Sequence, residues 1–158
     1  MYLETTIPSA YFDERTEPKI AARRSWTREW WDHHRQGYEL VTSIAVREEL
    51  LNGPSHENRD LLALLAGLPD LAIGPEIEEI VEVYIERFVM PRDPTGDALH
   101  LAVASFHQCD ILLTWNCKHL ANHRKLDHIR RVNTLLGLHT PAILTPLELM
   151  DEGGPDAT

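Results

Sequence analysis

The chain has 158 residues, of which 43% are hydrophobic and 25% are charged. Its length suits one compact domain, and this balance of residues excludes a disordered chain. No apolar run approaches the roughly 20 residues that a membrane-spanning helix needs. The first residues, Met1 to Glu4, lack the basic segment and the long apolar stretch of a secretory signal. We therefore expect a soluble, cytoplasmic protein without membrane contact, with one domain over residues 1–150 and a disordered tail over residues 151–158.

The formal net charge is -10, and the isoelectric point lies near 5.3. Proteins that coat nucleic acid by bulk charge need a surplus of Lys and Arg, so this class is excluded. An acidic chain can still process nucleic acid when its carboxylates hold metal ions that meet the phosphate. It can also bind a basic partner. The two cysteines, Cys109 and Cys117, are too few for a disulfide framework.

Short apolar runs alternate with helical patterns in the first half of the chain. A β-rich run follows Met1, and Pro8 limits how far it can continue as a strand. Ala22, Trp26 and Trp30 recur at the spacing of an amphipathic helix, and Ser43 is placed to cap another. The elements predicted here are a strand over 2–8, a helix over 20–35, a strand over 38–43, a helix over 43–51, a helix over 58–66 and a strand over 71–73.

The second half continues the alternation. Pro75 opens a helix whose apolar residues, such as Ile77 and Tyr84, share one face. The run Asp110 to Trp115 is the strongest strand candidate, because it is short, apolar and bounded by polar residues. The elements predicted here are a helix over 76–88, a rigid linker over 90–94, a helix over 97–104, a strand over 110–115, a mostly helical stretch over 118–136, a strand over 141–146 and a turn over 147–150.

Strands separated by helices predict an α/β fold, a three-layer sandwich whose mainly parallel sheet is flanked by helices. In such sheets the functional groups gather at the carboxyl ends of the strands. Four side chains are predicted to stand there. Glu4 follows the start of the first strand, Glu49 lies past the second, and Asp97 begins the helix before the central strand. Asn116 directly follows that strand. We expect these side chains to converge at one edge of the sheet.

Carboxylates held a few ångströms apart repel one another, so at least one should take up a proton unless a cation compensates. Hard oxygen ligands select Mg²⁺ or Mn²⁺ over Zn²⁺. A bound ion of this kind lowers the pKa of a water molecule and offsets charge on a phosphoryl oxygen. The arrangement therefore predicts metal-dependent attack of water on a phosphodiester.

The order of several short motifs resembles the PIN-domain family, in particular the VapC-like toxins of toxin–antitoxin pairs. The resemblance spans nearly the whole chain, each block is weak alone, and the blocks occur in the family's order. The matching blocks are Tyr2 to Ser9, Ser43 with Glu49-Leu50, Gly96 to Ala102, Asp110 to Asn116, and Thr145 to Leu149.

This resemblance implies a PIN fold and an Mg²⁺- or Mn²⁺-dependent ribonuclease that cleaves an RNA substrate. It also implies a small basic antitoxin protein that blocks the site, and a homodimer. Carried over by position, Glu4, Glu49 and Asp97 are the expected metal ligands. Together with Asn116 they form the expected catalytic set. Thr5 matches a hydroxyl residue beside the first acid.

Two residues depart from the family pattern. Glu4 stands where an aspartate is usual and is one methylene longer, and Asn116 stands where many members carry a further acid. Asn116 coordinates weakly through its carbonyl and brings no charge, so a second metal should bind less well. These departures keep open an alternative, a catalytically weakened module that binds RNA or a protein. A phosphohydrolase of small phosphate esters ranks last, because no Gly-rich phosphate loop supports it.

Other polar residues have competing interpretations. Glu48 is adjacent to Glu49 but points about 100° away on a helix, so it is expected in solvent. His100 suits a core histidine, yet it follows Asp97 by three residues and could approach the site. One cluster suggests zinc, but its cysteines bracket a strand instead of forming a short hairpin. That cluster is Cys109, Cys117, His119, His123 and His128.

Two groups of cations are candidates for RNA contact. One lies on the Trp-rich helix and is equally consistent with an ordinary solvated face. The other follows Asn116 and could guide an RNA backbone toward the metal. The first group is Arg23, Arg24, Arg28 and Arg35, and the second is Arg124, Lys125, Arg130 and Arg131. The tryptophans Trp26, Trp30 and Trp31 are expected in the core or in an interface, and nothing in the sequence singles out base stacking.

Overall fold

A small parallel sheet lies at the centre of the molecule in the computed structural model, which describes residues 1–53, 58–90 and 96–152. Its strands are β1 (Tyr2–Leu3), β2 (Ile111–Leu113) and β3 (Ala142–Leu144), in the order β1-β2-β3. Leu3 pairs with Leu113, and Leu112 pairs with Ile143. All pairings are parallel, as the alternation of strands and helices predicts.

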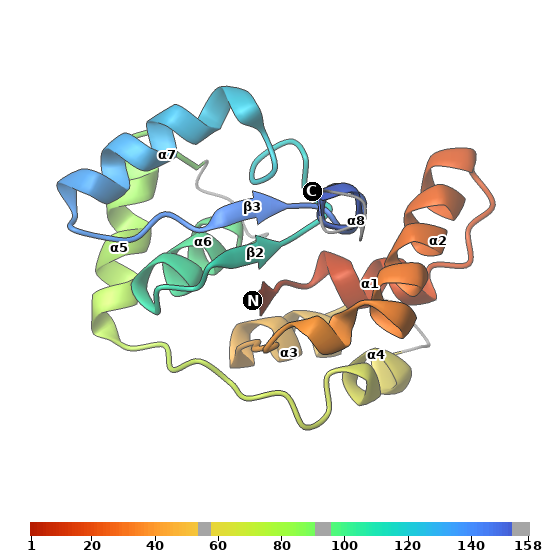
Figure 1. Cartoon of the computed structure of the whole chain (residues 1–158). Helices are drawn as coiled ribbons and strands as arrows, with labels where there is room; N and C mark the ends of the chain where they lie inside the picture. The colour runs from red at the N-terminus through yellow and green to blue at the C-terminus, as the bar shows by residue number, and fades with distance from the viewer. Residues whose placement is uncertain (54–57, 91–95, 153–158) are drawn as a thin grey trace.

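Helices surround this sheet (Figure 1). Within the described residues they are α1 (Thr6–Phe12), α2 (Pro18–His33), the 3₁₀ turn η1 (Arg35–Gly37), α3 (Ile44–Asn52), α4 (Asn58–Leu64), α5 (Pro75–Glu86), α6 (Asp97–Phe106), α7 (His123–Leu135) and α8 (Pro146–Glu152). The expected fold class, a parallel sheet flanked by helices, is confirmed. None of the helices in the described part of the chain has the length and apolar character needed to cross a membrane.

Helix α6 explains how the site is placed. Almost every residue of it is buried, because it packs against both α5 and strand β2. Its sequence from Ala98 to Ala104 is apolar on all sides except for His100, as expected of a helix enclosed by protein. The N-terminus of α6 therefore brings Asp97 into the interior at a fixed position relative to the sheet.

The buried apolar side chains form a connected core beneath the sheet and helices. Leu3, Leu112 and Leu113 come from the sheet and are fully buried. Helix α5 contributes one face, while its glutamates point outward. Trp30 and Trp31 of α2 are buried, as expected, whereas Trp26 is 36% exposed. The largest fully enclosed side chains include Trp30, Tyr2, Tyr84, Ile7 and Met90.

The first predicted strand is too long. Strand β1 ends at Leu3, and Pro8 lies in the first turn of α1 instead of ending a strand. A proline is tolerated there because the first amides of a helix have no intrahelical acceptor, so its missing N–H costs no hydrogen bond. The turn into this helix falls at Glu4 and Thr5, which places both residues at the carboxyl end of β1.

The strands predicted over 38–43 and 71–73 are also wrong in extent. The first contributes two single bridge residues, Val41 to Tyr2 and Thr42 to Asp70, and residues 71–73 contribute none, because the bridge falls on Asp70. The backbone of Val41 bonds to Leu3 and Met1, and the chain then leaves the sheet at Ser43 to begin α3. A single bridge gives no alternating pattern of several residues, so its extent cannot be read from the sequence.

Helical boundaries differ modestly from the prediction. The stretch expected to be helical from 118 begins at His123, and the Asn122 side chain caps it by accepting from the Arg124 amide at 3.0 Å. The turn expected over 147–150 is the helix α8. This helix includes the first two residues of the predicted tail, and residues 153–158 lie outside the described residues. So does most of the predicted linker over 90–94.

Candidate functional site

Glu4 follows β1 directly and is only 2% exposed. Its Oε1 accepts a hydrogen bond from the Thr6 amide at 2.9 Å and another from the Thr6 hydroxyl. Burial raises the pKa of this carboxyl above its usual value, while His100, Thr6 and Thr114 act in the opposite direction. Glu4 is thus an interior acid whose charged form needs a cation or further donors nearby.

Glu49 occupies the middle of α3, and its side chain is 30% exposed. Both of its oxygens have partners. Oε2 accepts from the Thr5 hydroxyl at 2.5 Å, and Oε1 lies 2.8 Å from Nε2 of His100. The neighbouring Glu48 is exposed, so of the two glutamates only Glu49 faces inward. The carboxylate is therefore held at both ends, by the residue after Glu4 and by the helix that begins with Asp97.

Asp97 is the first residue of α6 and is 5% exposed. Within the described residues its Oδ2 is buried without any hydrogen-bond partner. A buried polar atom normally has a partner, and leaving a charged oxygen without one is costly. This orphaned oxygen is the feature of the site that most needs a further ligand.

Gly96 allows Glu49 to approach the start of α6. Its backbone has φ +76°, in the left-handed region that favours glycine. A Cβ atom at this position would lie 2.6 Å from Oε1 of Glu49 and 3.7 Å from Nε2 of His100. Any side chain at residue 96 would therefore displace the Glu49 carboxylate. The sequence shows this glycine, but only the coordinates show what approaches it.

His100 is bonded to Glu49 and is influenced by the charges of Glu4 and Asp97. It is fully buried; Nε2 contacts Glu49, and Nδ1 lies 2.8 Å from the Tyr2 hydroxyl. That hydroxyl lies 2.8 Å from Oγ of Ser43. Burial lowers the pKa of His100, but the hydrogen bond to Glu49 and the charges of Glu49, Glu4 and Asp97 outweigh this, so the pKa is raised. Both interpretations left open for His100 hold: it is a buried histidine with hydrogen-bond partners, and one of these partners is Glu49.

Asn116 follows β2 as predicted but has a local role. Its Oδ1 accepts from the His119 amide at 3.0 Å, and its own amide donates to the Thr114 hydroxyl at 2.9 Å. These bonds shape the turn that leaves the strand, a common use of asparagine. The structure ties Glu49 to the neighbourhoods of Glu4 and Asp97, whereas no contact joins the Asn116 side chain to the other three predicted site residues.

We call Glu4, Glu49, Asp97 and His100 the acidic site. Across residues 1–53, 58–90 and 96–152, no group of three or more His, Cys, Asp or Glu side chains stands close enough to form a ready-made metal cage. The donor set nevertheless fits a hard dication, because it offers carboxylate oxygens and one of them, on Asp97, lacks a partner. Glu4, Glu49 and Asp97 are the residues that could hold such an ion.

The cysteines and histidines weighed as a zinc site, and judged unlike one from the sequence, do not form a metal-binding group among the described residues. Cys109 is buried at the end of α6, and Cys117 is exposed beyond β2. His128 binds the Arg87 carbonyl through Nε2 at 2.7 Å.

The predicted basic group after Asn116 is also divided. Lys125 is half-buried and donates to the Val89 carbonyl at 3.0 Å. Burial lowers the pKa of Lys125, although the negative charge of Asp97 acts in the opposite direction. Arg130 instead turns toward a different hollow.

Two hollows are linked through the Thr5–Glu49 hydrogen bond, because Thr5 lines one and Glu49 lines the other. The glutamate hollow, about 450 Å³, is lined by residues that include Glu48, Glu49 and Gly96. The arginine hollow, about 220 Å³, is lined by residues that include Thr5, Ser9, Ile20, Arg23 and Trp115. Because Thr5 borders one hollow and Glu49 borders the other, a ligand crossing the site would extend into both.

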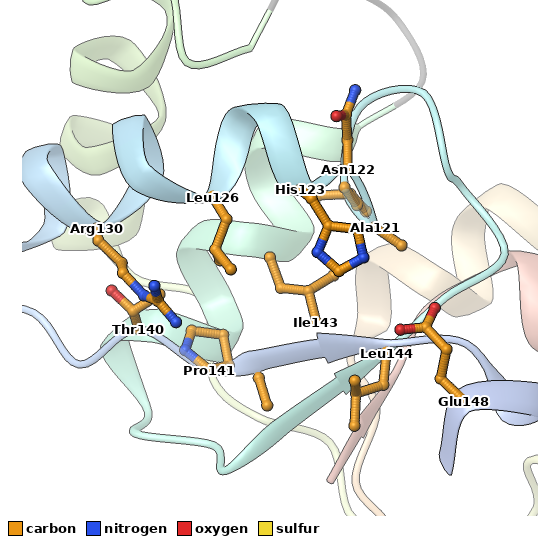
Figure 2. Close-up of a pocket in the computed structure, with 12 residues that line it drawn as sticks. Ala121, Asn122, His123, Leu126, Arg130, Thr140, Pro141, Ile143, Leu144 and Glu148 are labelled. Atoms are coloured by element: carbon orange, nitrogen blue, oxygen red, sulfur yellow. The ribbon is translucent and has the colours of Figure 1, made fainter. Parts of the chain in front are cut away.

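A further hollow of about 340 Å³ lies between α7 and β3 (Figure 2). Arg130 and Thr140 stand at one end of it, and Glu148 stands at the other. Its lining includes none of Glu4, Glu49, Asp97 and Asn116. This hollow is therefore separate from the acidic site.

A family model described as PIN domain matches residues 1–123. The matched segment carries all four predicted site residues and ends at the first residue of α7. No curated protein and no solved structure matches the chain.

Proposed function

Because the chain belongs to the PIN domain family, we propose that it is a metal-dependent endoribonuclease that hydrolyses phosphodiester bonds of RNA. Proteins of this family are generally nucleases that need metal ions. The observation that carries the proposal for this chain is the buried Oδ2 of Asp97, which has no hydrogen-bond partner among the described residues, together with a second interior acid, Glu4, since the charges of both act on His100. Two enclosed carboxylates in one neighbourhood are costly without a cation.

In this proposal Glu4, Glu49 and Asp97 hold Mg²⁺ or Mn²⁺. The ion supplies a water of lowered pKa and offsets the charge that grows on the phosphoryl oxygens. The protein contributes position. Thr5 and His100 fix the two oxygens of Glu49, so its carboxylate cannot rotate away when substrate enters. The overall hydrolysis adds water to phosphorus and breaks the bond from phosphorus to one ribose oxygen, and that oxygen takes up the proton that the water loses.

We further propose that the chain is the toxin of a toxin–antitoxin pair, acting as a homodimer in the cytoplasm. Its net charge of -10 supports a small basic antitoxin as the partner, because opposite charges speed association and disfavour wrong partners. A reading frame for a small basic helical protein beside that of this chain would support the assignment. Co-expression of the two should suppress the nuclease activity.

The nuclease proposal is tested by incubating purified protein with structured and single-stranded RNA, with Mg²⁺, with Mn²⁺ and with EDTA. We expect cleavage only with metal. Asp97→Asn should lower the rate on the order of a hundredfold or more, since the ion contributes several kcal/mol. Asp127→Asn is the matched control, because that side chain is 82% exposed. Cleavage that survives both EDTA and Asp97→Asn would refute the proposed site.

A second candidate is a module that binds RNA or protein without cleaving. Two observations favour it: Oε1 of Glu4 is already engaged by Thr6, and the Asn116 side chain is used within its own turn. This candidate predicts no metal-dependent cleavage, together with binding that persists after Glu4→Gln and Asp97→Asn. Metal-dependent cleavage by the wild-type protein would exclude it.

A further inference from the structure

The arginine hollow lies beside the acidic site and is enclosed by α1, the start of α2 and the end of β2. Thr5 joins this hollow to the acidic site, because it lines the hollow and its hydroxyl donates to Glu49. Any group bound in the hollow is therefore next to the carboxylates that we propose hold the metal. No function considered so far uses this hollow.

Arg23 differs from the other arginines of α2 that face α1 and the α1–α2 loop. Arg24 donates to the carbonyl of Asp13, and Arg28 donates to the carbonyl of Tyr11 at 2.8 Å, so both hold the connection to α1. Arg23 has no carboxylate within ion-pair distance among the described residues. Among the described residues, the only hydrogen-bond partner of its side chain is Sγ of Cys117, at 3.8 Å. Its charge is thus available to a ligand.

The position of Arg23 is nevertheless fixed. Its guanidinium lies 5.3 Å from the ring centroid of Trp115, and Trp115 stacks on Trp26 with centroids 6.0 Å apart. Trp115 is itself anchored, since its Nε1 donates to the hydroxyl of Thr27 at 2.7 Å. A guanidinium held near an aromatic ring by this attraction still has N–H groups free to bind an anion.

The remaining walls limit what the hollow can take. Arg15 also borders it but is paired with Asp13 at 2.6 Å, so Arg23 supplies the net positive charge. Ser9 offers an exposed hydroxyl, and Ile20 and Trp115 offer apolar surface. A volume of about 220 Å³ is below the roughly 300 Å³ at which pockets enclose a drug-sized molecule. One sugar–phosphate unit suits this space.

The two hollows beside the acidic site carry opposite charge. Glu48 and Glu49 border the glutamate hollow, whereas Arg23 borders the arginine hollow. We propose that the arginine hollow binds the phosphodiester unit of single-stranded RNA next to the one that is cleaved, with Arg23 contacting its phosphate. This inference rests on the proposed nuclease function. It predicts that the RNA strand next to the cleaved bond runs from the acidic site into the arginine hollow.

The test is a binding titration of a short, end-labelled single-stranded RNA of mixed sequence, followed by fluorescence anisotropy at several salt concentrations. All variants carry Asp97→Asn, so that the RNA stays intact. Arg23→Gln should weaken binding on the order of tenfold, the effect of one charge-assisted hydrogen bond. It should also reduce the slope of log K against log salt by about 0.7, the value for one phosphate contact on a single strand.

Two variants act as controls. Lys19→Gln makes the same charge change on the same helix at an exposed position outside the hollow, and should leave the slope unchanged. Arg23→Lys restores the charge and should recover the slope while binding remains weaker, because it lacks the planar fork. Equal effects of Arg23→Gln and Lys19→Gln would overturn the proposal, as would absence of RNA binding by the unmutated Arg23 protein. Circular dichroism of each variant checks that it is folded.

Cleavage by the wild-type protein with Mn²⁺ is measured separately, so the two proposals can fail independently. If the wild type does not cleave but the slope depends on Arg23, the hollow is an RNA-binding site and the nuclease proposal is wrong. If the wild type cleaves RNA but Arg23→Gln does not change the slope of log K against log salt, the nuclease proposal is supported and the proposed subsite is wrong.

Discussion

At the scale of single residues, Asp97 combines burial with an oxygen that has no partner. Burying such an oxygen destabilises the folded protein, and a bound cation would remove this destabilisation. In metal-free protein we expect Asp97→Asn to unfold at the same temperature as the wild type or at a higher one. The expected gain in its free energy of unfolding is at most about 1 kcal/mol. With Mn²⁺ the order should reverse, because only the wild type is stabilised by ligand binding.

Thermal unfolding in EDTA and in Mn²⁺ measures both effects. Asp127→Asn again serves as the control, since its exposed side chain should change neither midpoint. If Mn²⁺ raised the midpoint of Asp97→Asn as much as that of the wild type, the ion would bind elsewhere.

Gly96 gives a second prediction at this scale. Gly96→Ala should cost stability through its positive φ and should also displace Glu49, because the new Cβ would lie 2.6 Å from Oε1. Gly67→Ala is the matched control, with φ +83° and no atom within 4 Å of the added Cβ. Both variants should lose about 1 kcal/mol from backbone strain. Only Gly96→Ala should also lose most of its RNA cleavage, as measured by initial rates with Mn²⁺.

At the scale of elements, a buried polar network ties α5, α6 and α7 together. The Tyr84 hydroxyl donates to Oδ1 of Asn133 at 2.5 Å, and the Asn133 amide donates to the hydroxyls of Ser105 and Thr140. These bonds fix the helix that begins with Asp97 against its neighbours. The network therefore supports the site from a distance, through the position of α6.

The same network makes stability depend on alkaline pH. Burial raises the pKa of Tyr84 to about 12, although its hydrogen bonds to Ser105 and Asn133 act to lower it. In the unfolded chain the phenol ionises near pH 10, so between about pH 10 and 12 the unfolded state loses its proton first and unfolding becomes easier. The Tyr84 titration alone should cost about 2 to 3 kcal/mol in this window, at 1.36 kcal/mol per pKa unit, in addition to the loss from buried Tyr2, whose pKa is also raised.

Tyr84→Phe lacks this titration. It should be less stable than the wild type at neutral pH by about 1 to 3 kcal/mol, because Asn133 loses a donor in the interior. Urea unfolding at a series of pH values should then show the two curves converging as pH rises from 10 to 12. Parallel curves across this range would mean that Tyr84 ionises near its ordinary value in the folded protein.

The sequence predicted the helices well where an apolar face repeats over three turns, as in α2 and α5, and it placed β2 correctly. It failed where the signal is short or non-local. The helix α1 was missed because Pro8 can end a strand as well as occupy a first helical turn. The bridges at Val41 and Thr42 each involve one residue, which leaves no period to detect.

The candidate site also has features that the sequence suggested and features that it did not. The three acids could be named because strand ends in parallel sheets converge. The link through His100 was only suggested by its spacing from Asp97, since its bonds to Tyr2 and Glu49 join residues 98 and 51 positions apart. Asn116 was predicted for the catalytic set from its place after the strand, whereas its side chain accepts from the His119 amide within its own turn. The arginine hollow was not predicted, because the availability of Arg23 depends on what its neighbours on α2 bind.

At the scale of the whole molecule, the net charge of -10 opposes RNA. Binding must therefore depend on local positive charge and on the metal ion at the acidic site. We expect the affinity of the wild type for single-stranded RNA to fall on the order of tenfold when Ca²⁺ is replaced by EDTA, at constant ionic strength. Anisotropy measures this change directly. Equal affinity in both conditions would show that the metal does not take part in holding the RNA.

The stacked arrangement of Trp26, Trp115 and Arg23 has a practical consequence. Trp115 is a fluorophore already in contact with the guanidinium that we propose grips the phosphate. When that guanidinium shifts toward an anion, the emission of the indole beneath it changes. Of the other tryptophans, Trp30 and Trp31 are enclosed in the core and away from the hollow lining, so their signal stays constant. The molecule thus carries an intrinsic optical reporter of occupancy, and Trp115→Phe would silence it.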